Sequence, residues 1–112
     1  MRQFTTPEQT AKLMELGFEK PKSVTEISWQ EDEKDNPIIN ANTIEYTRHY
    51  SIGELIEMLP PKLGGHHLLI ERYIEYGQWL VYYEISMSGS IAPELIDALY
   101  NMIVKLKEVK IL

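Results

Sequence analysis

The hydrophobic and polar positions between Leu68 and Ser86, in the stretch LLIERYIEYGQWLVYYEIS, suit a β-hairpin. This stretch also holds the densest group of β-branched and aromatic residues in the chain. A period of two is typical of a strand with one buried face, and a glycine near the middle suits a tight turn. The pattern therefore predicts a β-hairpin over residues 68–86 that turns at Gly77.

The register of this hairpin decides which side chains share a face. A two-residue loop at Gly77-Gln78 suits a type II′ turn, and a four-residue loop centred on the same point keeps the same pairs. A three-residue loop would place Glu75 opposite Trp79 and mix charged with apolar positions, so we expect an even register. One face then carries four cross-strand pairs: Tyr76–Trp79, Ile74–Val81, Arg72–Tyr83 and Ile70–Ile85.

We expect this first face to be covered by the C-terminal helix, because it carries Trp79 and most of the aliphatic residues of the hairpin. Arg72 is the one charged residue on it. We expect its guanidinium to stack on Tyr83, or its aliphatic stem to carry the charge to the rim of the sheet. Either arrangement keeps the charge out of the core.

The opposite face of the hairpin is the candidate functional surface. In the same register Glu71 lies opposite Glu84, and like charges in direct opposition favour a face that is open to water. Tyr73 lies opposite Tyr82 on that face, and exposed aromatic side chains are common in protein contacts. The predicted protein-contact patch consists of Tyr73, Tyr82, Glu71, Glu75 and Glu84. The alternative is that the Phe4 region or the first helix covers the two rings.

The first helix is predicted over residues 7–16. Thr6 and Gln9 have the spacing of a capping box, and the proline between them suits the first helical position. Gly17 suits the position that follows a helix C-terminus. This helix is short and only modestly amphipathic, so packing against the rest of the domain has to hold it.

The second helix is predicted over residues 52–59. Ser51 and Glu54 have the spacing of another capping box, and Tyr50 and Leu55 have the spacing of a hydrophobic staple. We therefore assign Ser51 to capping rather than to nucleophilic chemistry. The proline pair that follows residue 59 ends the helix.

The third helix is predicted over residues 91–107, after the break at Ser88-Gly89-Ser90. Its apolar positions cover more than a narrow stripe, and they are Leu95, Ile96, Leu99, Tyr100, Met102, Ile103 and Leu106. Such breadth indicates a helix that lies across the sheet or is covered on a second side as well.

One or two short strands are predicted between the first two helices, at Thr43–Arg48 and, as a further candidate, at Val24–Trp29. The polar stretch 30–37 that separates them is typical of a solvated loop. The elements together predict one α+β domain over residues 1–112. We expect a small antiparallel sheet of three or four strands, centred on the hairpin at 68–86, with helices at 7–16, 52–59 and 91–107 packed mainly on one face.

Composition and charge narrow the function classes. With 112 residues, 44% of them hydrophobic, the chain suits one folded domain. Its 17 acidic and 11 basic residues give a net charge of −6, which disfavours nucleic-acid binding. The absence of cysteine excludes disulfides and thiol chemistry. No apolar run approaches the roughly 18 residues of a membrane span, so we expect a cytoplasmic protein without membrane contact.

The chain carries no strong signature of catalysis or metal binding. His66 and His67 directly precede the predicted hairpin, and while this segment is extended their side chains point to opposite faces and cannot chelate one ion. Glu54 and Glu57 share one side of the second helix, where exposed carboxylates mainly solubilise the surface. A nucleophile elbow, a phosphate-binding glycine loop and a dinucleotide fingerprint are all missing from the sequence. We expect no catalytic residue, no cofactor and no bound metal.

Three segments carry a resemblance: FTTPEQTAKLMELGFEKP, YSIGELIEMLPPKL and ELIDALYNMIVKLKE. Together they resemble small uncharacterised proteins of gut Bacteroides-type bacteria and of their prophages or mobile elements. The resemblance covers the two capped helices and the C-terminal helix. It implies an origin in a mobile element and an accessory role, and it brings no catalytic residues with it.

These observations predict a non-enzymatic protein that binds an unidentified protein partner through the Tyr73 and Tyr82 patch or through a sheet edge. The alternative is a homo-oligomeric structural protein, such as a homodimer, assembled through the C-terminal helix or a sheet edge. A small hydrolase is a third reading, and it would require a buried acidic pair or a histidine cluster.

Overall fold

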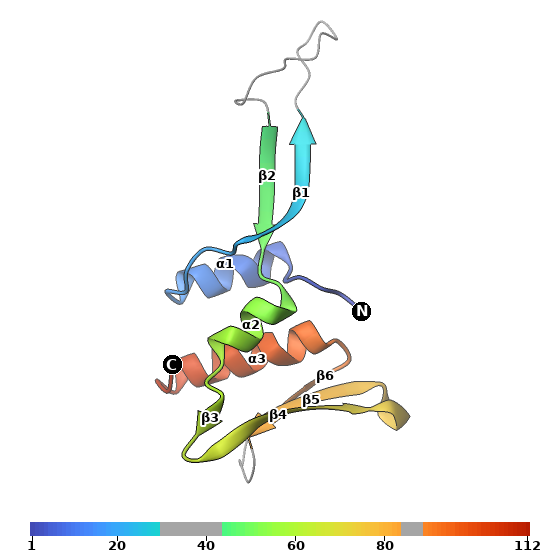
Figure 1. The fold of residues 1–112 in the computed structure, drawn as a ribbon, viewed down its shortest axis with the longest axis vertical. Helices are drawn as coiled ribbons and strands as arrows, with labels where there is room; N and C mark the ends of the chain where they lie inside the picture. Colours follow the sequence, from blue (N-terminus) through green and yellow to red (C-terminus); the bar gives the residue numbers. More distant parts are fainter. Residues whose placement is uncertain (30–43, 84–88) are drawn as a thin grey trace, which may run out of the picture.

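The structure is a computed structural model that describes residues 1–29, 44–83 and 89–112, with the backbone alone at 25–29 and 44–46. Figure 1 shows the elements in chain order. They are α1 (Pro7–Glu15), β1 (Ser23–Trp29), β2 (Ile44–His49), α2 (Ile52–Met58), β3 (Lys62–Leu63), β4 (His66–Tyr73), a short 3₁₀ turn η2 (Ile74–Tyr76), β5 (Gln78–Tyr83), β6 (Ser90–Ala92) and α3 (Leu95–Glu108).

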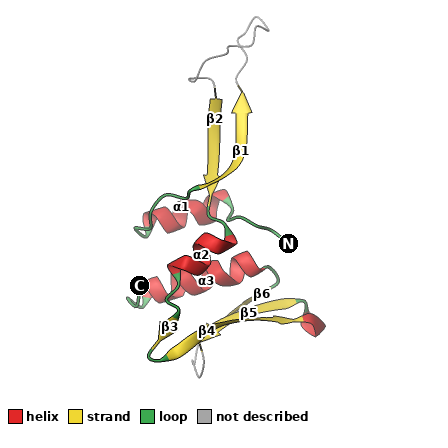
Figure 2. Cartoon of the chain, viewed as in Figure 1, coloured by secondary structure: helices red, strands yellow, loops and turns green. Residues whose placement is uncertain are grey.

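The domain is an α+β fold, as the sequence predicts. A four-stranded antiparallel sheet has the order β3-β4-β5-β6. Helices α2 and α3 lie on one side of this sheet, and α1 lies beyond them on the side away from the sheet (Figure 2). Strands β1 and β2 form a separate two-stranded sheet that projects from the helices, at the opposite end of the molecule from the larger sheet (Figure 1).

Helix α3 is the centre of the core. Its breadth of apolar positions is explained by cover on two sides, because β5 and β6 contact it from the sheet and α2 contacts it from the helix layer. The buried residues of α3 are Leu95, Ile96, Ala98, Leu99, Met102, Ile103 and Leu106. Other elements add Leu13, Tyr50, Leu55, Leu59, Val81 and Tyr83 to the same core.

Both predicted capping boxes are present. The Thr6 side chain accepts a hydrogen bond from the Gln9 N–H, and the Gln9 side chain accepts one from the Thr6 N–H. Ser51 and Glu54 make the same reciprocal pair at the start of α2. Gly17 has a φ of 99°, the left-handed conformation that a residue after a helix C-terminus adopts.

The start of the third helix differs from the prediction. The sequence places its first residue at 91, whereas α3 begins at Leu95 and residues Ser90–Ala92 form β6. Ser90 and Ala92 are buried, and they pair with Val81 and Trp79 of β5. Pairing with β5, whose partner residues lie nine to thirteen positions away in the chain, overrides the helical pattern here.

The loop of the central hairpin has an even number of residues, as predicted, but the predicted cross-strand pairs are wrong. The observed partners are Leu68–Tyr83, Leu69–Tyr82, Ile70–Val81, Glu71–Leu80, Arg72–Trp79 and Tyr73–Gln78. The loop therefore begins earlier than predicted, and η2 is followed by Gly77 in the left-handed conformation, with φ 59° and ψ 34°. A two-residue type II′ turn is excluded by this geometry.

The division of the hairpin into two faces survives this shift, because the change in register is even. Val81 and Tyr83 are buried under α3, and Ile70 and Trp79 pack against the core beside them. Arg72 shares this face but stacks on Trp79, with its guanidinium carbon 5.5 Å from the ring centroid, and not on Tyr83. Glu84 and Ile85 themselves lie outside the described residues, and their predicted partners Glu71 and Ile70 pair with Leu80 and Val81 instead.

Strands β1 and β2 correspond to the two candidate strands between the first helices. They pair from Ser23 and His49 at one end to Trp29 and Ile44 at the other, with a bulge between Val24 and Glu26. The predicted loop at 30–37 lies outside the described residues.

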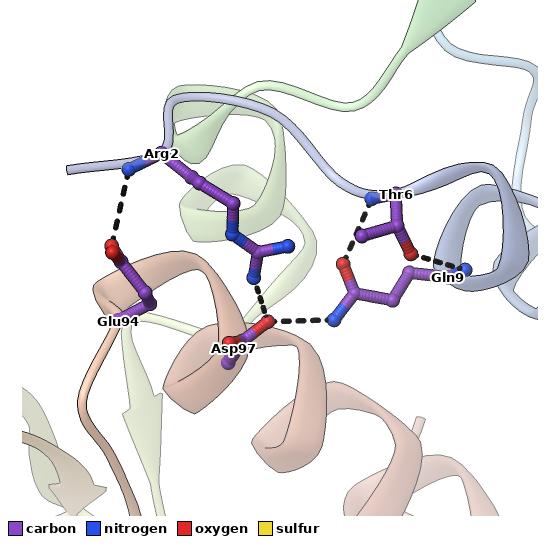
Figure 3. Close-up of polar contacts among 5 residues, drawn as sticks. All are labelled: Arg2, Thr6, Gln9, Glu94 and Asp97. Atoms are coloured by element: carbon purple, nitrogen blue, oxygen red, sulfur yellow. Dashed lines mark hydrogen bonds and ion pairs between the residues drawn. The ribbon is translucent and has the colours of Figure 1, made fainter.

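The N-terminal segment is tied to the start of α3 by a polar cluster, drawn in Figure 3. Asp97 accepts a hydrogen bond from the Gln9 side chain at 2.7 Å and pairs with the Arg2 guanidinium. The Arg2 N–H donates to Glu94 at 3.1 Å. This cluster holds α1 and the chain start against the start of α3.

Candidate functional site

The face of the large sheet that points away from α3 is the candidate site, and we name it the open face. Its residues are Leu69, Glu71, Tyr73, Leu80, Tyr82 and Ile91, which the strand pairing places on one side. Tyr73 is 42% exposed and Ile91 is 58% exposed. Leu69, Leu80 and Tyr82 are half-buried by their neighbours on the sheet.

Neither of the predicted covering segments lies on the open face. Phe4 forms a bridge with Ser51, beside the start of α2. Helix α1 lies on the side of α3 that is away from the sheet (Figure 1). The alternative in which the Phe4 region or the first helix shields the two tyrosine rings is therefore wrong.

The predicted contact residues do not form one compact patch. Tyr82 donates a hydrogen bond to the Glu71 carboxylate at 2.6 Å, so these two side chains are joined. Tyr73 does not face Tyr82 as predicted. Because Tyr82 pairs with Leu69, the two tyrosine positions lie about 13 Å apart along the hairpin, at about 3.3 Å per residue.

The remaining two residues of the predicted patch are Glu75 and Glu84. Glu75 lies in η2 at the end of the hairpin and is exposed. Glu84 lies outside the described residues. The predicted opposition of Glu71 and Glu84 is wrong, because Leu80 is the partner of Glu71.

The end of the hairpin carries two apolar side chains that the predicted register places on the covered face. Ile74 is 80% exposed and Tyr76 is 74% exposed, because both lie in η2 and not in a strand. Together with Tyr73 they form what we name the hairpin tip. A predicted loop that began at Ile74 would have placed both residues in the turn, but the sequence pattern around Gly77 is compatible with several loop positions.

A groove with a volume of about 440 Å³ lies between the hairpin and the start of α3. Its lining residues are Met1, Arg72, Trp79, Pro93 and Glu94. Arg72 and Glu94 bring opposite charges to this groove, and the Trp79 ring face is occupied by the Arg72 guanidinium. The groove thus joins the covered face of the hairpin to solvent.

A second pocket, of about 220 Å³, lies beside α2, between that helix and the residues that follow α1. Tyr50 and Glu54 line it, and both already have structural partners. The Tyr50 hydroxyl donates to the Glu19 carbonyl. The Glu54 carboxylate accepts from the Ser23 hydroxyl and from the Lys22 N–H.

The pKa shifts in this second pocket follow from those contacts. Burial raises the pKa of the Tyr50 hydroxyl, and the nearby Glu54 carboxylate adds to the rise. Burial also opposes ionisation of Glu54, but hydrogen bonds from Ser23, Lys22 and Ser51 outweigh it and lower the pKa of the carboxyl group. A carboxylate held in this way closes a loop against a helix start and is a poor general base.

The histidines are dispersed. His66 and His67 are adjacent in β4, so they point to opposite faces of the sheet as predicted. The His49 ring is 2.7 Å from the Thr10 hydroxyl. Among the described residues, no three His, Cys, Asp or Glu side chains are grouped as metal ligands would be.

The helices of the described ranges are all too short or too polar to cross a bilayer. Comparison with known proteins finds no matching family model, no matching curated protein and no matching solved structure. A function can therefore be proposed only from the residues and geometry of this chain.

Proposed function

We propose that this protein is a non-enzymatic interaction module that binds another protein through the open face and the hairpin tip. The observation that supports the proposal is the group of exposed apolar side chains at one end of the hairpin: Tyr73, Ile74 and Tyr76. Burying large apolar side chains removes their surface from water, which is favourable, and aromatic side chains in particular dominate the energy of protein contacts.

The rest of the open face suits the same role. Ile91 adds an exposed aliphatic side chain on β6, and the Tyr82–Glu71 hydrogen bond holds an aromatic ring and a carboxylate in fixed positions. A rigid surface binds with a smaller entropy loss than a flexible one. A strand hairpin that is anchored by α3 can therefore present its outer side chains without rearranging.

The burial of α3 counts against the alternative of a homodimer built on this helix. The seven buried residues of α3 already pack inside their own chain, so little of the apolar face is left for a second copy. An accessory role in a mobile element, and a cytoplasmic location, stay predictions from the sequence.

The test compares capture of a partner by matched variants. Immobilised protein is exposed to a lysate of the source organism, and the proteins retained by the wild type are compared with those retained by the double variant Tyr73→Ser/Tyr82→Ser. We expect the double variant to lose a retained protein while keeping its circular dichroism spectrum.

Met14→Ser is the matched control, because Met14 is 40% exposed but lies on α1. This control should retain the same protein as the wild type. If the double variant retains every protein that the wild type retains, the open face is not the contact surface.

A further inference from the structure

The outer edge of β4 has backbone groups without a strand beside them. The Leu68 N–H donates to the Pro61 carbonyl at 3.0 Å, on the side of β4 that faces β3. Backbone groups of alternate residues point to the same edge, so the N–H and C=O groups of Ile70 and Arg72 point that way too. Strand β3 pairs only with His66 and His67, and no other described segment pairs with β4 on this side.

The chain leaves this edge because of its two prolines. Pro61 has no N–H to donate to the Leu68 carbonyl, so the pairing of β3 with β4 cannot continue. The Tyr83 hydroxyl donates to the Pro60 carbonyl at 2.7 Å, which holds that residue on the core side of the sheet. Among the described residues, no strand therefore continues β3 beside the backbone of Ile70 and Arg72.

Pairing of this edge with the same edge of a second copy is disfavoured by charge. An antiparallel pair centred on residue 71 would place Glu71 directly opposite the Glu71 of the other copy, and like charges in that position are destabilising. A pair centred on Arg72 opposes two guanidinium groups. A pair centred on Ile70 needs the Leu68 N–H, which is already bonded to Pro61.

We infer that this edge accepts an extended segment of another protein, added as a strand beside Ile70–Arg72, with a basic side chain opposite Glu71. The inference rests on the proposed function and names its partner chemistry. Glu71 is held by Tyr82 on the open face, and Glu75 adds a second negative charge at the adjoining turn. The Arg72 guanidinium lies on the other face over Trp79, where it does not neutralise Glu71.

The added strand would also reach the groove between the hairpin and the start of α3. Its residue opposite Arg72 has its side chain on the same face as Arg72, because paired residues share a face. That face opens into the groove lined by Trp79 and Pro93. The bound segment therefore combines a basic residue with a neighbouring residue that enters this groove.

The test uses two synthetic peptides of eight residues that alternate Thr and Val, one with a central Lys and one with Glu in its place. Binding is followed by amide chemical shifts and by amide hydrogen exchange of the full-length protein. We expect the Lys peptide to protect the Ile70 and Arg72 amides from exchange. We expect the Glu peptide to bind about five-fold more weakly, because it sets like charges opposite each other.

Three variants examine the separate parts of the inference. Glu71→Gln should abolish the preference for Lys over Glu, whereas Glu75→Gln, at a position outside the paired edge, should retain most of it. Arg72→Pro should abolish binding of both peptides, because proline removes an edge donor that no strand of the fold uses. Its fold is checked by circular dichroism, and the exchange data on the wild type stand without it.

Equal affinity for the two peptides, or no protection of the Ile70 and Arg72 amides, would overturn the strand-addition inference. Shifts confined to Tyr73, Tyr82 and Ile91 would overturn it as well, while supporting binding to the open face. The capture experiment of the preceding subsection tests the proposed function independently, so the two failures are distinguishable.

Discussion

The two faces of the β4–β5 hairpin carry similar residue types but have opposite environments. On the covered face, Val81 is 0% and Tyr83 is 2% exposed, whereas Tyr73 on the open face is 42% exposed. Both faces carry aromatic and aliphatic side chains on the same two strands. The difference lies in α3, which covers one face alone. A sheet with apolar residues on both sides, covered by the central helix on one of them, keeps apolar side chains such as Tyr73 and Ile91 exposed on the other.

The largest expected effect is the loss of stability caused by a cavity under the covered face. Leu99 is fully buried on α3, so Leu99→Ala should lower the free energy of unfolding by about 3 kcal/mol. Ile91→Ala on the open face should change it by no more than about 0.5 kcal/mol. Urea unfolding measures both, and similar losses for the two variants would contradict the contrast between the faces.

The second effect is a loss of stability at alkaline pH that depends on buried tyrosines. Burial raises the pKa values of Tyr50 and Tyr83 above the ordinary value of about 10. The unfolded chain therefore releases these protons at a lower pH than the folded chain. Stability is fully present below pH 10 and falls above it, by at most about 1.4 kcal/mol per pH unit for each tyrosine.

The free energy of unfolding, measured by urea denaturation at a series of pH values from about 8 to about 12, checks this slope. Tyr83→Phe should make the slope shallower, because it removes one of the shifted groups. An unchanged slope in this variant would show that Tyr83 ionises equally easily in the folded and unfolded chains.

The smallest effect compares two neighbouring tyrosines on opposite faces. Tyr83→Phe removes a hydrogen bond to the Pro60 carbonyl at the edge of the core and should cost about 1 kcal/mol at neutral pH. Tyr82→Phe removes a hydrogen bond to Glu71 on the exposed surface and should cost less than about 0.5 kcal/mol. A reversed order, measured by urea unfolding, would mean that the open face is covered in solution.

Local features of the fold could be predicted because their causes are local. The capping boxes at Thr6 and Ser51 depend on hydrogen bonds between residues three apart, so a short sequence pattern contains all of their partners. The reversal at Gly17 likewise follows from one residue without a side chain. The helix starts at Pro7 and Ile52 were therefore correct to the residue.

The position of the hairpin turn could not be predicted in the same way. Gly77 suits a two-residue loop, and it also suits the last position of the loop Ile74–Gly77 that the structure has. The choice between them depends on which side chains lie under α3, a contact between segments distant in the chain. The exposure of Ile74 and Tyr76 in the hairpin tip depends on this choice. The sequence pattern therefore placed both residues on the covered face, which is wrong.

The sequence by itself determined the helix starts at Pro7 and Ile52, their caps, and the separation of the hairpin into two faces, because a period of two assigns each strand residue to a side whatever the even register. Only the tertiary structure decided the register, the strand at Ser90–Ala92 and the open edge beside Ile70 and Arg72. These depend on packing against α3 and on where β3 ends, and both bring together residues that no local pattern connects.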